Sequence, residues 1–549
     1  MLLLPLLKKL FPILYLQQRG DSMERDDQLL PAPPAPETLF KLAPPAALPT
    51  LPSFSDKTSV NIRYPLIEPY AYAHIFWERA SNELVYQVEE PVLSGEERGL
   101  LQTVEQGIFE LLNISFINVK DTTKIVEYLE KNIKVLLAEL GVKVSEETFL
   151  KIVYYVYRDF VGLNRIEPLM RDYFIEDIEC NGANTPLYIV HRKYRNLRTT
   201  IIYEDMDELS SFVEKLAQKC GKYISYANPI LDGRLPDKSR ANATYSQEIS
   251  SRGPTFTIRK FTAEPWSPVK LMQFKTISPE ILAYLWLLIE YESNFVIIGG
   301  TGSGKTSLMN AIAFFIPPSS RIISIEDTHE LNLLHENWLP SVSREATGVG
   351  EEGKFGEVDL FTLLKESFRQ RPDYVIVGEI RGKEAFVLFQ GAASGHPTAC
   401  TMHAEDVQTM VRRLETPPIS LPPSLVETID VVCVITQAKV GGESVRRLKE
   451  VVEIIEIGEG RGAIRTNTPF VWDPATDTFF FKTDSHMFGK LVKKYGINQE
   501  FLKREFMRRT RLLMELYRRN IAGYQEVHDI ISAYYKTPDQ VLRRFTILV

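Results

Sequence analysis

A glycine-rich segment, residues 299–306, has the residue types needed to hold a triphosphate. It reads Gly-Gly-Thr-Gly-Ser-Gly-Lys-Thr, the complete G-x-x-x-x-G-K-T phosphate loop. Glycines let the backbone wrap closely, so that successive N–H groups and the start of the next helix point at phosphate oxygens. Lys305 is expected to neutralise the β- and γ-phosphates, and the Thr306 hydroxyl is expected to hold Mg²⁺. The expected nucleotide-binding residues are Gly299, Gly300, Thr301, Gly302, Ser303, Gly304, Lys305, Thr306 and Ser307.

Three glutamates could supply the acid–base chemistry of γ-phosphate hydrolysis, which needs a positioned water, a base and magnesium. Glu326 and Glu330 follow the apolar segment 321–325, and Glu379 follows the apolar segment 374–377. The carboxyl ends of parallel strands lie at one edge of a sheet, beside the phosphate loop. Glu379 has the position of a magnesium-binding acid, although Gly378 stands where an aspartate is usual. Glu379 therefore acts alone or with the other two, unless residues 326–330 are an ordinary acidic surface turn.

Histidines and arginines give a weaker indication of function than the glutamates. His396 and His403 flank the apolar segment 398–402, and they are either ordinary residues or groups near the γ-phosphate. Neither has the His or Cys neighbours of a transition-metal site. Arg234, Arg240 and Arg259 precede all these segments, and composition alone assigns them no role.

The elements that must position these residues alternate along the chain. Helical stretches separate apolar runs at 295–298, 321–325, 374–377, 398–402 and 431–435. This alternation predicts a parallel sheet with helices on both faces. Earlier residues mix helical periodicity (124–140, 148–158, 207–220) with strand-like runs (187–190, 255–258). Later residues predict a hairpin from 470–472 and 478–481.

The two ends of the chain leave alternatives open. Residues 1–16 are apolar, but the stretch is short and is interrupted by proline and lysine. These residues are therefore too short and too broken a stretch to span a bilayer. They are a disordered tail, an early start (Met1, with Met23 next) or a weak membrane-surface anchor. A helix expected over 498–519 has an apolar face and a basic face that is either solvated or bound to acidic headgroups or an acidic partner. The basic face comprises Lys503, Arg504, Arg508, Arg509, Arg511, Arg518 and Arg519.

Whole-chain composition narrows the class of protein. A net charge of −7 over 549 residues is not typical of a protein that mainly binds nucleic acid. The cysteines form no CxxC pair, which excludes a local zinc knuckle and fits a reducing cytosol.

Over roughly residues 160–450 the chain resembles the secretion ATPase superfamily of type II and type IV secretion, type IV pilus and archaellum motors. Residues 166–169 and 175–178 resemble the opening of its N-terminal domain, and residues 326–330 resemble its Asp box. Residues 377–381 resemble its Walker B motif, glycine included, and residues 395–396 with 402–403 resemble its His box. The resemblance implies Glu330 as the preferred base, Glu379 near magnesium and His403 as a γ-phosphate sensor. It also implies that Arg234, Arg240 and Arg259 reach the nucleotide from the N-terminal lobe.

The implied protein is a Mg²⁺-dependent ATPase that forms a hexameric ring with ATP between two lobes. The missing four-cysteine zinc module and the basic helical tail resemble the archaeal branch, whose members drive pilus or archaellum assembly with a polytopic membrane platform. Implied partners are further copies, that platform and acidic lipid at the cytoplasmic face of the membrane, without nucleic acid. The alternatives are a RecA-like nucleic-acid translocase, a type IV secretion ATPase that exports DNA or protein, and a nucleotide-gated scaffold without hydrolysis.

The expected fold class is α/β, with a RecA-like parallel-sheet P-loop ATPase domain preceded by a mixed α+β N-terminal domain. Six segments are expected, in chain order. They are a disordered proline-rich tail (1–58), an α+β subdomain (59–145), a PAS-like α+β domain (146–261), a hinge (262–276), the ATPase domain (277–460) and a hairpin with helices (461–549).

Overall fold

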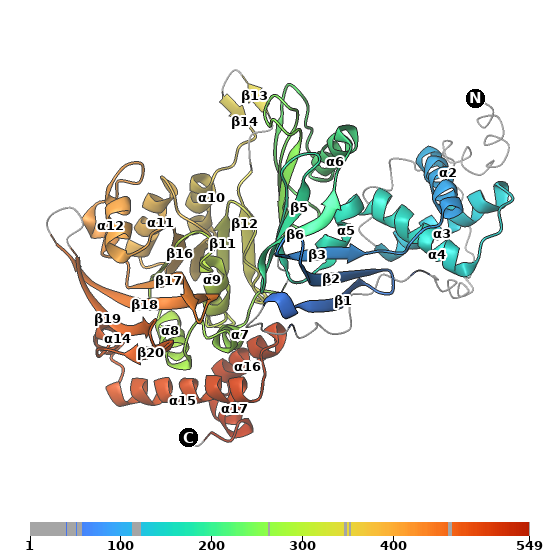
Figure 1. The fold of residues 1–549 in the computed structure, drawn as a ribbon. Helices are drawn as coiled ribbons and strands as arrows, with labels where there is room; N and C mark the ends of the chain where they lie inside the picture. Colours follow the sequence, from blue (N-terminus) through green and yellow to red (C-terminus); the bar gives the residue numbers. More distant parts are fainter. Residues whose placement is uncertain are drawn as a thin grey trace, which may run out of the picture. The chain divides into compact units, whose positions relative to one another are not determined.

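The computed structural model describes residues 57–111, 122–261, 264–344, 348–350, 353–458 and 464–547, together with Phe40 and Leu51. Apart from those two residues and 57–58, the predicted tail lies outside the described residues, and so do both candidate start positions. Phe40 and Leu51 are buried, and the Phe40 amide donates to the Glu130 carboxylate at 2.6 Å. The chain forms two compact units, Met1–Tyr173 with Thr199–Ile201, and Phe174–Arg198 with Ile202–Val549 (Figure 1).

The first unit combines an antiparallel three-stranded meander with helices. Its main elements are β1 (Asn61–Ile67), β2 (Ala71–Glu78), β3 (Glu83–Glu89), α2 (Gly95–Leu111), α3 (Thr122–Glu139), α4 (Glu146–Val156) and α5 (Glu167–Arg171). The helices predicted at 124–140 and 148–158 are confirmed as α3 and α4. Ser145 caps α4 by accepting from the Thr148 amide at 3.1 Å. Tyr64 and Tyr86 both donate to the buried Asp172 carboxylate, at 2.6 and 2.7 Å.

The second unit begins with antiparallel strands in the order β6-β5-β4-β9-β8-β7, although residues Thr199–Ile201 of β6 belong to the first unit. Their bounds are β4 (Ile175–Cys180), β5 (Pro186–His191), β6 (Arg195–Ile202), β7 (Ile230–Arg234), β8 (Arg240–Thr244) and β9 (Thr255–Arg259). Helix α6 (Met206–Lys219) begins at the cap Asp205 and packs on β7 and β8, with Phe212 and Leu216 buried. This antiparallel sheet carries the three arginines singled out in the sequence.

The rest of the second unit is built on a second sheet, in the order β12-β11-β15-β16-β10-β17-β18-β19-β20. The first six strands are parallel, as the alternation of elements predicts, and the expected α/β fold class is confirmed. The parallel strands are β10 (Phe295–Ile298), β11 (Ile322–Glu326), β12 (Trp338–Val342), β15 (Tyr374–Val377), β16 (Thr398–Met402) and β17 (Val431–Val440).

Helices cover both faces of this sheet because its central strands are apolar on both sides. On β10, Phe295 and Ile297 join one buried cluster while Val296 and Ile298 join the other. The first cluster includes α7 (Pro268–Gln273), α8 (Pro279–Glu290) and α9 (Lys305–Ala313). The second includes α10 (Leu360–Ser367), α11 (Glu384–Ala393), α12 (Val407–Glu415) and α13 (Pro423–Val426). Helix α7 falls within the segment expected as a hinge, and its Val269 and Leu271 are buried in the first cluster.

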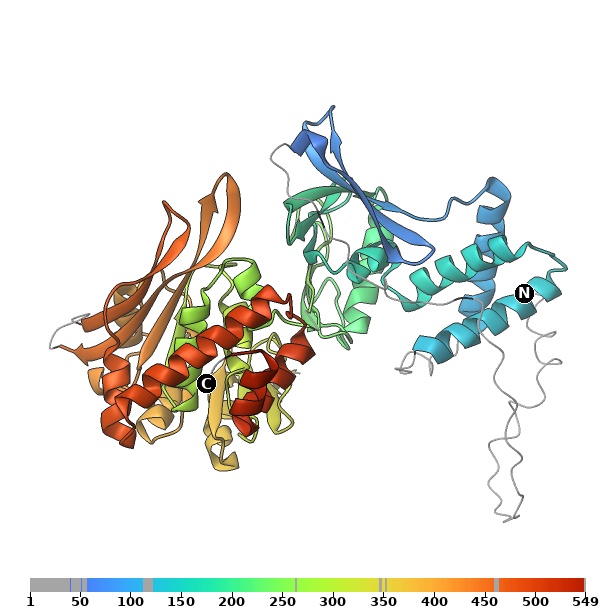
Figure 2. The ribbon, with the colours of Figure 1, turned by 90° about the horizontal axis from the view of Figure 1, so that it is seen from below.

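The C-terminal part continues both the sheet and the first cluster. The predicted hairpin is confirmed as β19 (Ile464–Asp473) with β20 (Thr478–Phe481), and β18 (Glu443–Ile457) joins it to the parallel strands. The helices α14 (His486–Tyr495), α15 (Gln499–Arg518), α16 (Tyr524–Lys536) and α17 (Pro538–Arg544) follow. Helix α15 packs against α8 (long red helix in Figure 2). Among the described residues, no helix combines the length and the apolar character needed to cross a bilayer.

Two residues of the predicted basic face, Arg508 and Arg509, are largely buried, and only 13% of the Arg508 side chain is exposed. Arg509 is only 3% exposed, so its assignment to a solvated face is wrong. Its guanidinium donates to the Glu290 carboxylate and lies 4.8 Å from the centre of the Trp286 ring. The apolar face of α15 therefore includes a buried arginine, which α8 neutralises.

Candidate functional site

The phosphate loop connects β10 to α9, and its backbone conformation depends on glycine. Gly302 and Gly304 have φ angles of +70° and +100°, a region that other residues rarely adopt. A Cβ atom at Gly299 would lie 2.3 Å from the Ile435 carbonyl oxygen. Lys305 is the first residue of α9, and its Nζ donates to the carbonyls of Gly299 and Gly300 at 3.2 and 3.1 Å. The loop is thus folded as a cradle with the lysine amine across it.

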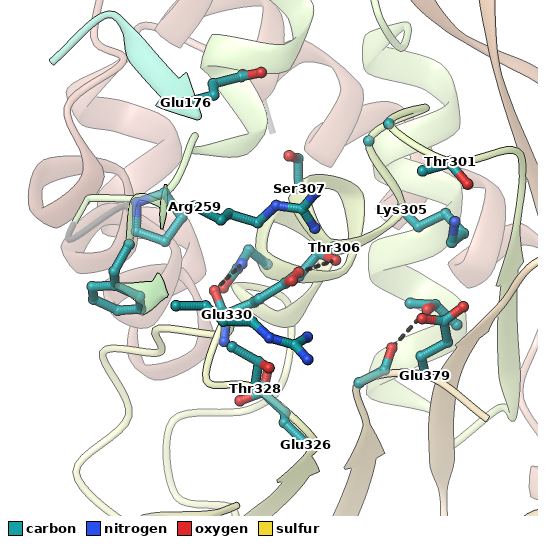
Figure 3. A pocket seen from close by; sticks show the side chains of 18 of the residues that line it. Glu176, Arg259, Thr301, Lys305, Thr306, Ser307, Glu326, Thr328, Glu330 and Glu379 are labelled. Carbon is teal, nitrogen blue, oxygen red and sulfur yellow. Dashed lines mark hydrogen bonds between the residues drawn. The ribbon is translucent and has the colours of Figure 1, made fainter. Parts of the chain in front are cut away.

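Two of the predicted acids lie beside this lysine. Burial lowers the pKa of Lys305, and the negative charges of Glu379 and Glu330 partly oppose that shift. The Thr306 hydroxyl donates to Glu330 Oε2 at 2.8 Å. Figure 3 shows Thr306, Glu330 and Glu379 around the same opening below the loop. The structure therefore brings the loop and both acids together.

Glu326 is held differently from these two acids. Its side chain is buried, and Oε1 accepts the backbone N–H groups of Glu330 and Leu331, both at 2.9 Å. Its Oε2 lies 3.2 Å from His329 Nδ1. A Cβ at Gly378 would lie 3.0 Å from Glu326 Cγ, which accounts for a glycine where an aspartate is usual. Glu326 thus anchors the turn that carries Glu330.

Glu379 follows β15 and pairs with a nearby arginine. Arg381 Nη2 donates to Glu379 Oε2 at 2.5 Å, and Arg381 Nη1 lies 3.9 Å from the Asp327 carboxylate. The hydrogen bond to Glu379 raises the pKa of Arg381. The Arg381 guanidinium therefore places a positive charge beside Glu379 at the opening.

The two histidines lie at opposite ends of β16. His403, at its carboxyl end, is exposed and lines the cavity beside the loop. His396 precedes the strand and packs on Phe368, with ring centres 5.2 Å apart. Only His403 lies at the site.

The three predicted arginines all contact acidic or carbonyl groups. Arg240 forms a forked pair with Asp232 at 2.6 and 3.0 Å, and Arg259 Nε donates to Asp177 at 3.2 Å. Both line the cavity, and Figure 3 shows Arg259 extending towards Ser307. Arg234 is not among the lining residues; it donates to the Asp327 carbonyl and so contacts the Glu326–Glu330 turn.

The cavity itself has a volume of about 780 Å³ and an excess of positive charge. Ten of its lining residues are Lys or Arg and six are Asp or Glu. The basic ones are Arg192, Arg195, Lys238, Arg240, Arg259, Lys260, Lys305, Arg381, Arg413 and Arg446. Such a cavity suits a polyanion of nucleotide size.

Residues 161–440 match the family described as type II/IV secretion system protein. The chain belongs to this family. A protein of Methanocaldococcus jannaschii, with no function in its name, is 35% identical over 502 residues, which cover 87% of this chain and 89% of its own. The type IV secretion system protein PtlH of Bordetella pertussis is 27% identical over 279 residues, 45% of this chain and 81% of its own. A solved VirB11 ATPase from Brucella suis is 24% identical with a TM-score of 0.27 and covers 52% of this chain and 92% of its own.

The family membership confirms the resemblance drawn from the sequence motifs, namely the opening of the N-terminal domain, the Asp box, the Walker B motif and the His box. The matched region spans the β4–β9 strands, the phosphate loop and all three acids. The long archaeal relative agrees with the archaeal branch inferred from the sequence.

Two arginines at the site of this secretion-family protein, Arg446 and Arg195, have no recognisable signal in the sequence. Arg446, on β18, donates from Nε to the Gly302 carbonyl at 2.9 Å and from its two Nη atoms to Glu176 at 3.5 Å. Burial lowers the pKa of Arg195, and the positive charge of the nearby Arg446 lowers it further. These contacts join segments of two different sheets that are far apart in the chain, and local sequence does not reveal them.

The oxygen donors at the site fit magnesium. Within the described part of the chain, no group of three or more His, Cys, Asp or Glu residues is arranged to hold a metal. Magnesium commonly takes one or two protein oxygens and completes its shell with phosphate oxygens and water. The Thr306 hydroxyl and the Glu379 carboxylate suit that arrangement.

Proposed function

We propose that this chain is a magnesium-dependent ATPase. The observation that carries the proposal is the convergence of the loop lysine, Thr306, Glu330 and Glu379 on one opening. Lys305 and the backbone N–H groups of residues 300–306 bind the phosphates. Thr306 and Glu379 would hold magnesium, which would neutralise charge on the phosphate oxygens.

Glu330 is the proposed base for the attacking water. Its carboxylate already contacts Thr306, beside the place of the γ-phosphate, and it carries no other side-chain hydrogen bond in the described residues. Both oxygens of Glu326 are engaged, so that Glu326 serves to position the turn. Arg240, Arg259 and His403 add positive charge or hydrogen bonds at the γ-phosphate end, and Arg234 supports the turn.

Two substitutions test this proposal. Lys305→Ala should abolish turnover. Glu330→Gln should still bind ATP but hydrolyse it at least about 10²-fold more slowly, since a general base contributes that much. Glu336→Gln, at an exposed position on the following segment, is the matched control and should keep full activity. Wild-type turnover in Lys305→Ala refutes the ATPase, and full activity in Glu330→Gln moves the base to Glu379 or Glu326.

The proposed cellular role is that of a homo-hexameric motor whose lobes drive assembly or secretion of pilus- or archaellum-like subunits. Support comes from the secretion family and from the archaeal relative. The motor is proposed to act at the cytoplasmic face of the membrane, on a polytopic platform and acidic lipid. On α15, Arg504 and Arg511 are exposed and, within the described residues, neither has a carboxylate partner. Co-sedimentation with anionic but not neutral vesicles checks the lipid contact; equal binding to both contradicts it.

A second candidate is a type IV secretion ATPase that exports DNA or protein. The similarity to PtlH, a type IV secretion system protein, favours it. Capture of the intact chain from native membranes distinguishes the two roles by the membrane protein that accompanies it. Stimulation of ATP hydrolysis by DNA would instead favour a nucleic-acid translocase.

A further inference from the structure

His329 packs against two aromatic rings that come from different parts of the second unit. Its ring stacks on Phe261 at 5.4 Å with an interplanar angle of 8°, and on Trp338 at 5.9 Å and 15°. The imidazole is buried and lies nearly parallel to both rings. Its plane is therefore fixed, and its two nitrogen atoms can reach only partners at its edges.

Each ring nitrogen meets one charged side chain. Nε2 lies 3.3 Å from Lys238 Nζ, and Nδ1 lies 3.2 Å from Glu326 Oε2. A lysine ammonium group only donates hydrogen bonds, so that Nε2 must accept. Nδ1 then carries the hydrogen and donates to Glu326. These partners select a single tautomer of His329.

The chain of hydrogen bonds continues into the backbone of the proposed base. Glu326 Oε1 accepts the N–H groups of Glu330 and Leu331. Lys238, His329 and Glu326 thus form a continuous path that ends at the turn carrying Glu330.

The other end of this path is anchored in the antiparallel sheet. Lys238 lies in the turn between β7 and β8, and its φ angle is +73°. The next residue, Ser239, accepts the Phe261 amide at 3.0 Å, and Lys238 Nζ lies 5.0 Å from the Phe261 ring centre. The β7–β8 turn and Phe261 therefore hold His329 together, one at its edge and the other on its face.

We propose that Lys238 and His329 are positioning residues that couple the β7–β8 turn to Glu330. When the turn is in place, Lys238 fixes the tautomer of His329, His329 orients Glu326, and Glu326 holds the backbone at Glu330. When the turn moves away, His329 loses one of its two partners and the Glu330 turn loosens. The expected effect of this coupling on turnover rests on the proposed function. The hydrogen-bonded coupling between the β7–β8 turn and the Glu330 turn does not depend on it.

The first test measures structure alone. Hydrogen–deuterium exchange of the nucleotide-free full chain, over a peptide that includes residues 330 and 331, reports on the two N–H groups held by Glu326. Lys238→Met and His329→Phe, which keeps the stacking, should each speed this exchange at least about tenfold because the anchoring bonds open more often. Lys439→Met, an exposed lysine on the β17–β18 hairpin, is the matched control and should change nothing. Unchanged exchange in both variants overturns the proposal.

The second test separates positioning from direct nucleotide binding, since Lys238 also lines the cavity. Lys238→Met should lower kcat about tenfold or more with little change in the Kd for an ATP analogue, because a small displacement of a catalytic group has effects of that size. Lys238→Arg, which can still donate to Nε2, should restore most of the activity. The double variant with His329→Phe should be no slower than His329→Phe alone. A raised Kd with unchanged kcat would make Lys238 a phosphate ligand and overturn the coupling.

The outcomes of these tests distinguish failure of the coupling from failure of the proposed function. Fast exchange together with full activity in Glu330→Gln keeps the coupling and removes Glu330 as the base. Normal exchange together with an inactive Glu330→Gln keeps the base and removes the coupling.

Discussion

At the residue scale, the absence of a side chain at Gly378 leaves room for the side chain of Glu326. A Cβ there would lie 3.0 Å from Glu326 Cγ and 3.4 Å from Glu326 Cβ. Gly378→Asp, which restores the more usual acid, should push Glu326 from its place and release the Glu330 turn. We expect turnover to fall at least about tenfold while ATP binding is retained.

Steady-state ATPase assays and binding of a fluorescent ATP analogue measure this effect. Gly489→Ala is the control, since a Cβ at this exposed position of α14 meets nothing within 4 Å. It should leave activity unchanged and stabilise α14 by up to about 1 kcal/mol. Wild-type turnover in Gly378→Asp would mean that Glu326 does not depend on this glycine.

The sequence predicts the part of the site that local chain geometry creates. The phosphate loop and the acids after β11 and β15 are close because each follows directly on a parallel strand, and parallel strands align their ends. Lys238 and Arg446 reach the same cavity from β-turns and strands far along the chain. Their positions depend on how sheets pack, and no residue spacing encodes that.

At the element scale, α15 contains one buried and several exposed arginines in the same basic stretch. Arg509 contacts Glu290 and the rings of Trp286 and Tyr534, whereas Arg511 is exposed without a partner in the described residues. Arg509→Ala should destabilise the protein by about 2–4 kcal/mol, because it leaves a cavity and an unpaired acid. Arg511→Ala should change stability by no more than about 0.5 kcal/mol.

Thermal unfolding followed by circular dichroism compares these two variants. Equal midpoints would contradict the buried position of Arg509. Sequence periodicity correctly predicts the start, length and apolar stripe of this helix. It cannot identify Arg509 as buried, because Glu290, the acid to which it donates, lies 219 residues away in the chain.

Helix α16 contributes His528 to a buried contact between two histidine rings. His528 lies against His335, with ring centres 5.5 Å apart, and burial lowers the pKa of both. At His335 the hydrogen bond to the Ile316 carbonyl opposes this shift of the pKa and the imidazole of His528 adds to it, while Asp529 opposes the shift at His528. Unfolding restores a pKa of about 6.5, so the unfolded chain takes up protons first as the pH falls. Stability from this contact is therefore fully present above about pH 6.5 and is lost towards the folded pKa values.

Unfolding midpoints between pH 7.5 and 5.5 measure this dependence. His528→Phe should flatten the decline, because it removes one titrating ring from an aromatic contact that also includes Phe314. His486→Gln, at an exposed position, should leave the decline unchanged. An identical slope in His528→Phe would place the acid-sensitive group elsewhere.

At the scale of the whole molecule, the exposed arginines of the antiparallel sheet bear on the proposed assembly of several copies. Arg259 is 60% exposed, and Arg240 is partly exposed even though each pairs with a carboxylate of its own chain. A cavity lined by half-exposed guanidinium groups is open enough for a further copy to complete its rim. We therefore expect nucleotide to promote assembly through the Arg234 and Arg240 region.

Multi-angle light scattering with and without a non-hydrolysable ATP analogue measures this assembly. Arg234→Ala with Arg240→Ala should shift the particle towards smaller species, whereas Arg369→Ala, on a short helix away from the cavity, should not. If neighbouring copies complete the site, specific activity should also rise with protein concentration until assembly saturates, because dilution separates the copies. A protein that stays monomeric at full activity excludes this mechanism, and each cavity would then be sufficient for catalysis.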